Sequence, residues 1–327
     1  MNAKRLCIAA VATFLAASLA AAQEILPKPE EGFKDAKIGR TYKDSKPGTM
    51  ALTKAPAGAP NVLIILIDDS GFGQWGTFGG QVSTPNLDRL AKMGLRYTRF
   101  HTTALCSPTR AALLTGRNHH SAGTGVITEI GDAYSGYSGQ VPKSAAMFAE
   151  VLRQGGYSTA FIGKNHNIAD WETSISGPFD RWPNLQGFNT STVSSVERWT
   201  SGSRFYIAAL PSSDGGSQGK EGNYTLNDSL ADDTIRYIHQ EKSTTPDRPF
   251  FIYYTPGATH APHHVPKEWI DKFKGQFNQG WDKYREEAYQ RQLKLGVIPP
   301  DTKLTARPPR FPRGILSRRT SSASLSG

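Results

Sequence analysis

The sequence predicts an α/β fold with a mostly parallel central sheet and helices on both faces. Three short apolar runs carry the strand signal, and segments with helical periodicity alternate with them. In an open sheet of this kind, ligands bind beyond the carboxyl ends of the strands. Each of the three predicted strands ends in polar residues. The functional site is therefore expected at that edge of the sheet.

The first predicted strand is Asn61–Ile67, an unbroken run of branched aliphatic residues. Such a run indicates a strand buried on both faces, as in a parallel sheet. The second and third predicted strands are Tyr157–Ile162 and Pro249–Thr255. Residues 177–222 are polar and rich in Gly and Ser, and we expect them to form irregular structure and short strands near the mouth of the site.

Helices are predicted where apolar residues recur at helical spacing. Ser83-Thr84-Pro85 indicates a helix start, and it is followed by Leu87, Leu90, Ala91 and Gly94 at that spacing. The other predicted helices are Ala145–Gln154, with Met147, Phe148, Val151 and Leu152 on one face, Ser229–Gln240 and Trp281–Leu295.

The start of the chain is typical of a secretory signal peptide, predicted for residues 1–22. Two basic residues precede the apolar run Leu6–Ala20, and cleavage before Gln23 fits an Ala-x-Ala site. The run is too short for a comfortable membrane span. We therefore expect a periplasmic or secreted protein with no membrane contact after cleavage. Residues 23–60 are expected to form an extended arm.

The net charge of +10 arises mainly at the two ends of the chain. Lys4 and Arg5 contribute +2 and the residues from Asp301 onward contribute +5, which leaves +3 for residues 6–300. This weak excess does not indicate a nucleic-acid partner, and it is compatible with a small anionic substrate. Residues 301–327 lack hydrophobic periodicity and are predicted to be a basic disordered tail.

Cys106 is the only cysteine expected in the mature chain, because Cys7 lies in the signal peptide. A lone thiol in an exported protein is intermolecular, inert or reactive. A helix that begins here would place Arg110 on the same face as Cys106. A helix N-terminus beside an arginine favours binding of a tetrahedral oxyanion such as sulfate or phosphate.

The stretch from Cys106 to Arg117 resembles the sulfatase signature, with Cys-Ser-Pro-Thr-Arg followed by Leu-Thr-Gly-Arg. The resemblance is to bacterial arylsulfatases of the alkaline phosphatase-like superfamily. It implies that a maturation enzyme oxidises Cys106 to formylglycine, whose hydrated diol attacks sulfur. Arg110 would hold the formylglycine, and Arg117 is expected to be structural. The alternative is that Cys106 is a small buried residue at a helix start.

Asp68 and Asp69 follow the first predicted strand. Adjacent carboxylates repel each other unless a cation lies between them, and such hard oxygen ligands suit Ca²⁺ or Mg²⁺. The alternative is that they are turn or capping residues. The resemblance implies that this pair binds a divalent metal, usually Ca²⁺ and alternatively Mg²⁺, which also contacts the formylglycine formed from Cys106.

Gly163-Lys164-Asn165-His166 follows the second strand and resembles a second sulfatase signature. The resemblance implies that Lys164 binds sulfate and polarises the leaving oxygen, and that His166 hydrogen-bonds the formylglycine. Asn165 stands where the family more often has an aromatic residue. Without the resemblance, the favoured alternative is that Lys164 is a solvated side chain and His166 a surface residue after a turn.

The segment Thr259-His260-Ala261-Pro262-His263-His264 follows the third strand. Its histidines would suit Zn²⁺, but the aspartate pair points to a harder cation. The segment is similar to the family's His-x-Pro-His, which implies that His260 contacts the substrate and protonates the leaving alcohol. His263 and His264 are expected to be supporting or solvent-facing.

The resemblance covers about residues 60–300, with an incomplete catalytic domain at 61–300. The family's later Asp-Asn pair, second sulfate-binding Lys and smaller C-terminal domain are not found in the sequence. We therefore expect the N-terminal part of a sulfatase, with weak metal affinity, poor solubility and little turnover. The expected reaction is hydrolysis of an aryl sulfate monoester. The alternatives are a phosphonate monoester or phosphodiester hydrolase, an inactive fragment, or a secreted binding module, which would explain neither signature.

Overall fold

The computed structural model describes residues 35–49, 53–174, 176–194, 205–207, 225–261, 263 and 265–307. The chain divides into two units between residues 52 and 53. In the first unit, the 3-10 helix η1 (Tyr42–Asp44) lies within a loop closed by an antiparallel bridge between Lys37 and Lys46. The predicted signal peptide lies outside the described residues. All candidate site residues belong to the second unit.

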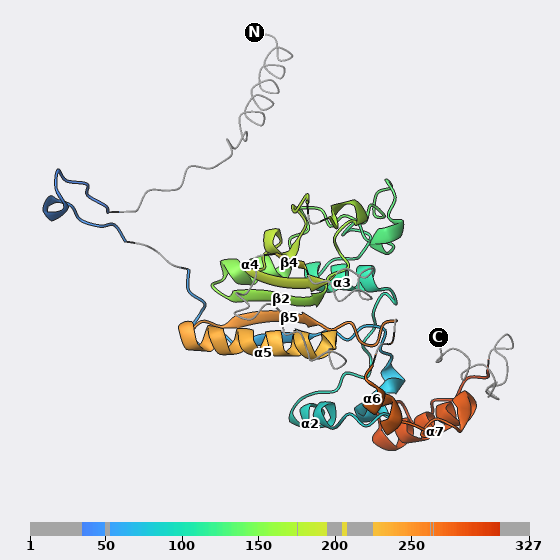
Figure 1. Cartoon of the computed structure of the whole chain (residues 1–327). Coiled ribbons are helices and arrows are strands. Elements are labelled where there is room, and N and C mark those ends of the chain that lie inside the picture. The colour runs from blue at the N-terminus through green and yellow to red at the C-terminus, as the bar shows by residue number, and fades with distance from the viewer. Residues whose placement is uncertain are drawn as a thin grey trace, which may run out of the picture. The chain divides into compact units, whose positions relative to one another are not determined.

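Among the described residues, the second unit has a five-stranded sheet in the order β1-β5-β2-β3-β4 (Figure 1). The strands are β1 (Val62–Ile65), β2 (Ser158–Lys164), β3 (Thr190–Ser194), β4 (Phe205–Ile207) and β5 (Phe250–Thr255). All neighbouring pairs are parallel except β3 and β4. Ile65 pairs with Tyr254, and Gly163 pairs with Thr255. The three predicted strands therefore end at one edge, as the sequence indicated.

Helices cover both faces of this sheet (Figure 1). The α-helices are α2 (Pro85–Met93), α3 (Cys106–Thr115), α4 (Phe148–Gln154), α5 (Leu226–Thr244), α6 (Lys267–Lys272) and α7 (Gly280–Leu295). The 3-10 helices of this unit are η2 (Phe72–Gln74), η3 (Gly76–Phe78), η4 (Thr128–Ile130), η5 (Asp170–Glu172) and η6 (Pro183–Leu185). The predicted mostly parallel sheet with helices on both faces is confirmed.

Alternate residues of β2 face two separate cores. Phe161 packs with Tyr253 and the α3 residue Leu114 on one side, whereas Ile162 packs with the α5 residue Leu230 on the other. All of β2 is buried, which explains why its sequence lacks a polar face. The central strands are therefore fixed in register, and their ends hold the site residues in place.

The prediction that the first strand is buried on both faces is wrong. Leu63 and Ile65 are 44% and 49% exposed, whereas Val62 and Ile64 pack against the core on the α3 side. The reason is that β1 lies at the edge of the described sheet, and α5 packs on β2 and β5. An aliphatic run shows that a strand can be buried, but a covering helix is needed to bury it.

Most predicted helices exist, with shifted ends. The helix expected over 145–154 begins only at Phe148, because Met147 has extended backbone, and Val151 is exposed rather than on the buried face. The helix expected over 229–240 begins earlier, at Leu226, because the Thr225 hydroxyl accepts a hydrogen bond from the Asp228 amide. In the region 177–222, predicted to form irregular structure and short strands, the described residues include the short strands β3 and β4, which extend the sheet.

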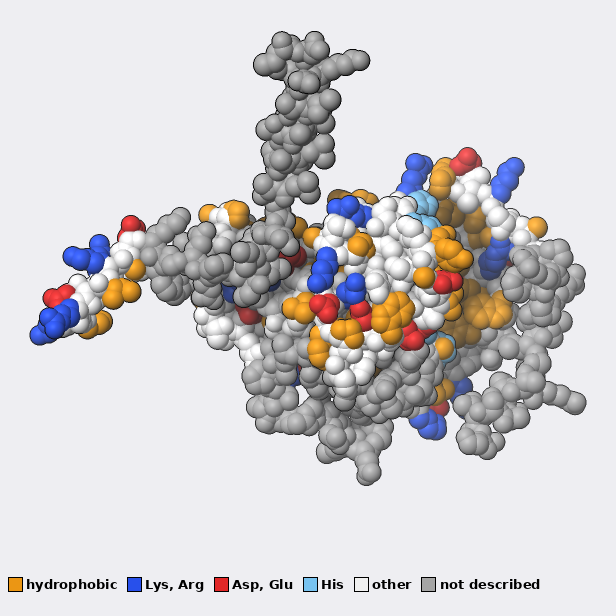
Figure 2. All heavy atoms as spheres, turned by 90° about the horizontal axis from the view of Figure 1, so that it is seen from above, with side chains coloured by type: hydrophobic (Ala, Val, Ile, Leu, Met, Phe, Trp, Pro, Cys, Tyr) orange, Lys and Arg blue, Asp and Glu red, His pale blue; other side chains and the backbone are white. Residues whose placement is uncertain are grey.

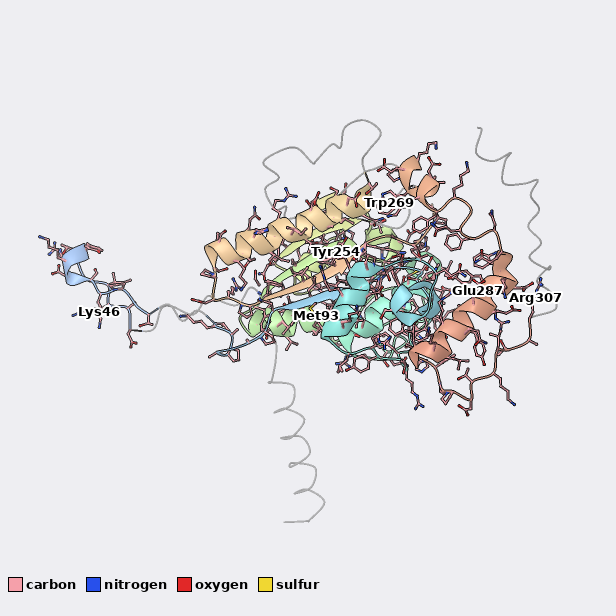
Figure 3. The ribbon with its side chains drawn as sticks, turned by 90° about the horizontal axis from the view of Figure 1, so that it is seen from below. Lys46, Met93, Tyr254, Trp269, Glu287 and Arg307 are labelled. Atoms are coloured by element: carbon pink, nitrogen blue, oxygen red, sulfur yellow. The ribbon has the colours of Figure 1, made fainter. Side chains whose placement is uncertain are left out.

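The described part of the predicted disordered tail, residues 301–307, makes defined contacts with α7. Arg307 Nη1 lies 2.8 Å from Asp282 Oδ2, and the Tyr289 hydroxyl donates to the Thr302 carbonyl at 2.6 Å. Arg307 and the α7 residue Glu287 are both labelled in Figure 3. Residues 308–327 lie outside the described part of the chain.

The surface of the molecule mixes charge types. On the face drawn in Figure 2, Lys and Arg side chains stand beside Asp, Glu and hydrophobic side chains rather than forming a continuous basic surface. Within the described residues, no helix combines the length and apolar character needed to cross a membrane.

Gly163, the penultimate residue of β2, is expected to resist substitution. Its φ is +119°, and a Cβ there would lie 2.0 Å from the Thr255 carbonyl oxygen on β5. Gly163→Ala should lower the free energy of unfolding by about 1–3 kcal/mol, measured by urea denaturation, because β5 must move. Gly296→Ala is the control, since φ is +63° there and nothing lies within 4 Å. An equal loss at Gly296 would contradict a role for the close contact.

Candidate active site

Three charged side chains form a buried network where β1 and β2 end. Asp68 Oδ1 lies 3.2 Å from Arg110 Nη2, and Asp68 Oδ2 accepts a hydrogen bond from Lys164 Nζ. The three residues are 5%, 1% and 0% exposed, in the order Asp68, Arg110, Lys164. Arg110 Nη1 and the Thr255 hydroxyl each donate to the Lys164 carbonyl at 2.9 Å. The network thus connects the ends of β1, β2 and β5 to helix α3.

The electrostatics of this network favour an ionised Asp68. Burial alone would raise the pKa of the carboxyl, but the hydrogen bond and charge of Lys164 and the charge of Arg110 outweigh burial and lower it. Two cations then share one carboxylate. The network has an excess positive charge in a low-dielectric environment, which favours an anionic ligand nearby.

Cys106 is the first residue of α3 and carries a free, partly buried thiol. Its pKa is lowered, first by its interaction with the His166 imidazole and further by the charge of Lys164, against an opposing effect of burial. A lowered pKa favours the thiolate, which is the form in which a cysteine reacts.

His166 is held in a tight environment after β2. The residue is 7% exposed and has a left-handed backbone with φ +58°. Its Nε2 lies 2.7 and 2.8 Å from the two carboxylate oxygens of Glu129. Burial alone would lower the pKa of His166, but its interactions with Cys106 and Glu129 raise it. Strained backbone of this kind is concentrated at functional sites in proteins.

Hydrogen bonds between side chains and the backbone tie these pieces together. The Asn167 side-chain amide donates to the Ser107 carbonyl at 2.9 Å, and the Thr128 amide donates to the Ser107 hydroxyl at 3.4 Å. The first turn of α3 is therefore joined to the loop after β2 and to η4.

Asp69 and His260 lie at the rim of the site. Asp69 has φ +50° and a side chain that is 57% exposed, and its Oδ2 lies 3.9 Å from His260 Nε2. The Thr259 hydroxyl donates to the carbonyls of both Asp68 and Asp69 at 3.1 Å. This contact joins the β5 end to the β1 end. His263 is exposed, as expected for a solvent-facing residue, and His264 lies outside the described residues.

A pocket of about 410 Å³ opens at the start of α3. It is lined by Leu66, Ile67, Asp68, Asp69, Ser70, Gly71, Thr102, Ala104, Leu105, Cys106, Thr109 and Arg110. Four of the candidate residues from the sequence thus share one pocket. Lys164, His166 and His260 do not line it: the first two are buried behind it, and His260 lies at the rim.

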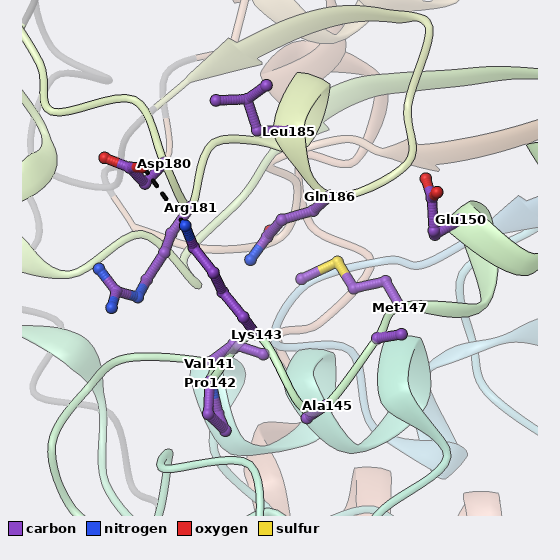
Figure 4. A pocket seen from close by; sticks show the side chains of 11 residues that line it. Val141, Pro142, Lys143, Ala145, Met147, Glu150, Asp180, Arg181, Leu185 and Gln186 are labelled. Carbon is purple, nitrogen blue, oxygen red and sulfur yellow. Dashed lines mark ion pairs between the residues drawn. The ribbon is translucent and has the colours of Figure 1, made fainter. Parts of the chain in front are cut away.

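A second pocket of about 380 Å³ lies between the 141–150 region and the 180–186 region (Figure 4). Its lining includes the ion pair between Lys143 and Asp180, at 3.5 Å, and the apolar side chain of Met147. It contains none of the residues predicted from the sequence. We therefore assign the candidate site to the pocket that holds Cys106.

The described residues alone do not form a divalent-metal site. No three His, Cys, Asp or Glu residues come together among them. Both oxygens of Asp68 are engaged by Arg110 and Lys164, and Asp69 points towards His260. Ca²⁺ takes about six to eight oxygen ligands, so this aspartate pair is insufficient by itself.

Several residues that the structure brings to the site could not be predicted from sequence motifs. Glu129 lies in a segment without a motif. Tyr253 lies within the apolar strand β5 and is buried near Arg110, and burial raises the Tyr253 pKa to about 12. Asn167 is next to His166, so a longer version of the second signature would have included it. Arg117, expected to be structural, donates to the Ser144 carbonyl at 3.4 Å.

Comparison with known proteins places these features in one family. The sulfatase family model matches residues 60–320. An uncharacterized sulfatase of Schizosaccharomyces pombe is 33% identical over 76% of this chain and 47% of its own length. The arylsulfatase of Klebsiella aerogenes is 29% identical over 75% of this chain and 52% of its own. The pig (Sus scrofa) N-acetylgalactosamine-6-sulfatase is 31% identical over 68% of this chain and 43% of its own length.

The fold agrees with this assignment. A solved structure of the yidJ protein from Bacteroides fragilis has a TM-score of 0.51 and 22% identity, covering 70% of this chain and 50% of that one. The chain spans about half the length of the curated relatives it matches. Because the family model covers most of the sequence and both signatures lie within it, the chain belongs to the sulfatase family.

Proposed function

We propose that this chain supplies the nucleophile and the anion-binding residues of an enzyme that hydrolyses sulfate monoesters, with aryl sulfates as the substrate class. One observation supports this most directly. Cys106 begins a helix, lines a pocket, and adjoins a buried network with excess positive charge. A tetrahedral anion at a helix N-terminus is stabilised by free backbone amides and by the helix dipole.

Sulfatases generally use a formylglycine and a divalent metal. We propose that Cys106 is the residue converted, by a formylglycine-generating maturation enzyme. The surroundings fit the conversion, since the side chain reaches the pocket and His166 Nδ1 is buried nearby without a hydrogen-bond partner among the described residues. The hydrated aldehyde supplies a hydroxyl that attacks sulfur and a second oxygen that releases sulfate.

The residues of the network bind and orient the substrate. Arg110 holds residue 106 from within α3 and balances charge at the pocket. Lys164 is now bonded to Asp68, so an incoming sulfate must compete with that carboxylate for the ammonium group. His260, at the rim, is the candidate acid for the leaving alcohol because its imidazole is partly exposed at the pocket entrance.

For the metal we propose Ca²⁺, with Mg²⁺ as the alternative. Asp68 and Asp69 would contribute carboxylates, and the other ligands must come from outside the described set. No step above depends on this ion. We also propose that the protein works in the periplasm or is secreted, because the chain begins with a signal-like sequence.

The proposal is tested by producing the chain together with a formylglycine-generating enzyme. Mass spectrometry of the peptide containing residue 106 should show loss of sulfur and gain of an aldehyde. The same preparation should hydrolyse 4-nitrophenyl sulfate faster than a 4-nitrophenyl phosphonate monoester. A faster phosphonate reaction would favour the alternative hydrolase, and conversion without any hydrolysis of either ester would contradict the proposed activity for this chain.

A further inference from the structure

We propose that Glu129 is a positioning residue that turns the His166 imidazole so that Nδ1, and not Nε2, meets the side chain of residue 106. The catalytic consequence rests on the proposed function, whereas the orientation itself can be tested without any turnover. Glu129 lies in η4, between the two sulfatase signatures and outside both of them. Nothing in the local pattern around it indicates a role in the site.

The first support is the contact between Glu129 and one ring nitrogen. Both carboxylate oxygens of Glu129 lie within 2.8 Å of His166 Nε2. A carboxylate accepts hydrogen bonds only, so Nε2 must carry the hydrogen and donate it. Nε2 therefore donates to Glu129 whether the imidazole ring is neutral or protonated.

The second support is the state of the other nitrogen. Within the described residues, Nδ1 of His166 is buried and has no hydrogen-bond partner. The imidazole nevertheless interacts with the thiol of Cys106. Because Nε2 is engaged by Glu129, the interaction with residue 106 falls to the Nδ1 side of the ring. A buried polar atom without a partner is costly, and a hydroxyl on residue 106 would satisfy it.

The third support is the rigidity of the frame around the ring. Ser107 accepts one hydrogen bond from Asn167 and one from Thr128, the neighbours of His166 and Glu129. The three segments that carry residues 106, 129 and 166 are therefore joined at adjacent positions. Turning the ring by half a rotation would place carbon atoms against the carboxylate and against residue 106. Glu129 selects the productive orientation by removing that alternative.

The chemical consequence follows from which ring nitrogen carries a hydrogen and which has a free lone pair. When Nε2 carries a hydrogen, the Nδ1 of a neutral imidazole has a lone pair that accepts the hydrogen of a hydroxyl group. If the proton moves to Nδ1, the O–H bond breaks, the N–H bond forms, and the resulting imidazolium stays paired with Glu129. Carboxylates that orient a working histidine in this manner are common in metal and catalytic sites.

The orientation is tested by proton NMR on the unconverted, full-length chain. A ring N–H that is buried and bonded to a carboxylate gives a downfield signal protected from exchange. We expect one such signal that is absent from His166→Asn and Glu129→Met, and retained in Glu129→Gln, whose amide oxygen can still accept. Glu150→Met is the matched control, because Glu150 pairs with Arg153 on the surface of α4, and it should keep the signal.

A proton–nitrogen correlation spectrum of the wild-type chain identifies the ring nitrogen that carries this proton. This test needs no variant of Glu129. Assignment to Nε2 of His166 supports the proposal, and assignment to Nδ1 overturns it, even if Glu129→Met fails to fold. Persistence of the signal in folded Glu129→Met would overturn it as well.

Kinetics on the converted enzyme give the catalytic consequence. Glu129→Met should lower kcat by about 10–100-fold with KM nearly unchanged, and Glu129→Gln should recover most of the loss. An unchanged kcat in Glu129→Met, with the NMR signal lost, would show that the orientation has no catalytic role. If the wild-type chain hydrolyses no sulfate ester, the proposed function fails, while the NMR result still decides the orientation.

Discussion

Asp68→Ala should lower the free energy of unfolding by about 3–5 kcal/mol, because it leaves Arg110 and Lys164 as buried cations without the carboxylate that both contact. A buried charge that loses its partner retains its desolvation cost. Urea denaturation gives the measurement, with the midpoint shifted and the slope unchanged.

Asp69→Ala is the matched control for this substitution. The neighbouring carboxylate is 57% exposed, so its loss should change stability by less than about 1 kcal/mol. The double variant Asp68→Ala/Lys164→Met should cost less than the sum of the two single changes, since it removes a cation together with its counter-ion. Equal losses for Asp68→Ala and Asp69→Ala would show that the buried network does not stabilise the fold.

The same carboxylate predicts how stability depends on pH. Its pKa is lowered from 3.8 in the folded chain, so the contribution of Asp68 to stability is fully present above that value. The contribution is lost as the pH falls through the lower pKa of the folded state. Asp68→Asn should therefore show a flatter acid limb than the wild type in unfolding measurements below the ordinary Asp pKa, and parallel limbs would contradict the assignment.

Cys106→Ala should abolish hydrolysis of 4-nitrophenyl sulfate, with a loss of about 10⁴–10⁶-fold in kcat, because the proposed reaction has no other nucleophile. The thiol is only partly buried, so the free energy of unfolding should change by less than about 1.5 kcal/mol. The measurement is the rate of nitrophenolate release by the chain produced with the maturation enzyme.

Thr102→Ala is the control for Cys106→Ala, because Thr102 lines the same pocket and lies outside the signature. It should keep the rate within about tenfold, as expected for a residue that lines the pocket without supplying the nucleophile. A Cys106→Ala chain that retained the wild-type rate would place the nucleophile elsewhere.

Local sequence patterns predicted the features that depend on neighbouring residues in the chain, such as strands and helix starts. Short apolar runs indicated β2 and β5, and Pro85 after Thr84 indicated the start of α2. The start of α3 at Cys106 followed from its own signature. The convergence of strand ends followed from the rule for parallel sheets, which is why the pocket residues were predictable.

The remaining features depend on neighbours that are distant in sequence. The hydrogen bond of Lys164 with Asp68 joins residues 96 positions apart, and Glu129 reaches His166 across 37. Val151 follows the helical pattern of its neighbours, yet no described element covers it. The periodicity of a sequence shows which side chains can be buried together. Which of them are buried depends on the other elements that pack against them.

The exposed edge of β1 has a consequence for handling the protein. Among the described strands none pairs with the outer side of Val62–Ile65, and this segment contains no lysine, proline or bulge. Natural proteins use such features to prevent edge-to-edge addition of a second chain. Together with the half-exposed Leu63 and Ile65, the open backbone groups form a template for intermolecular sheet growth. Purification at low concentration, or a charged residue at position 63, is therefore expected to limit aggregation.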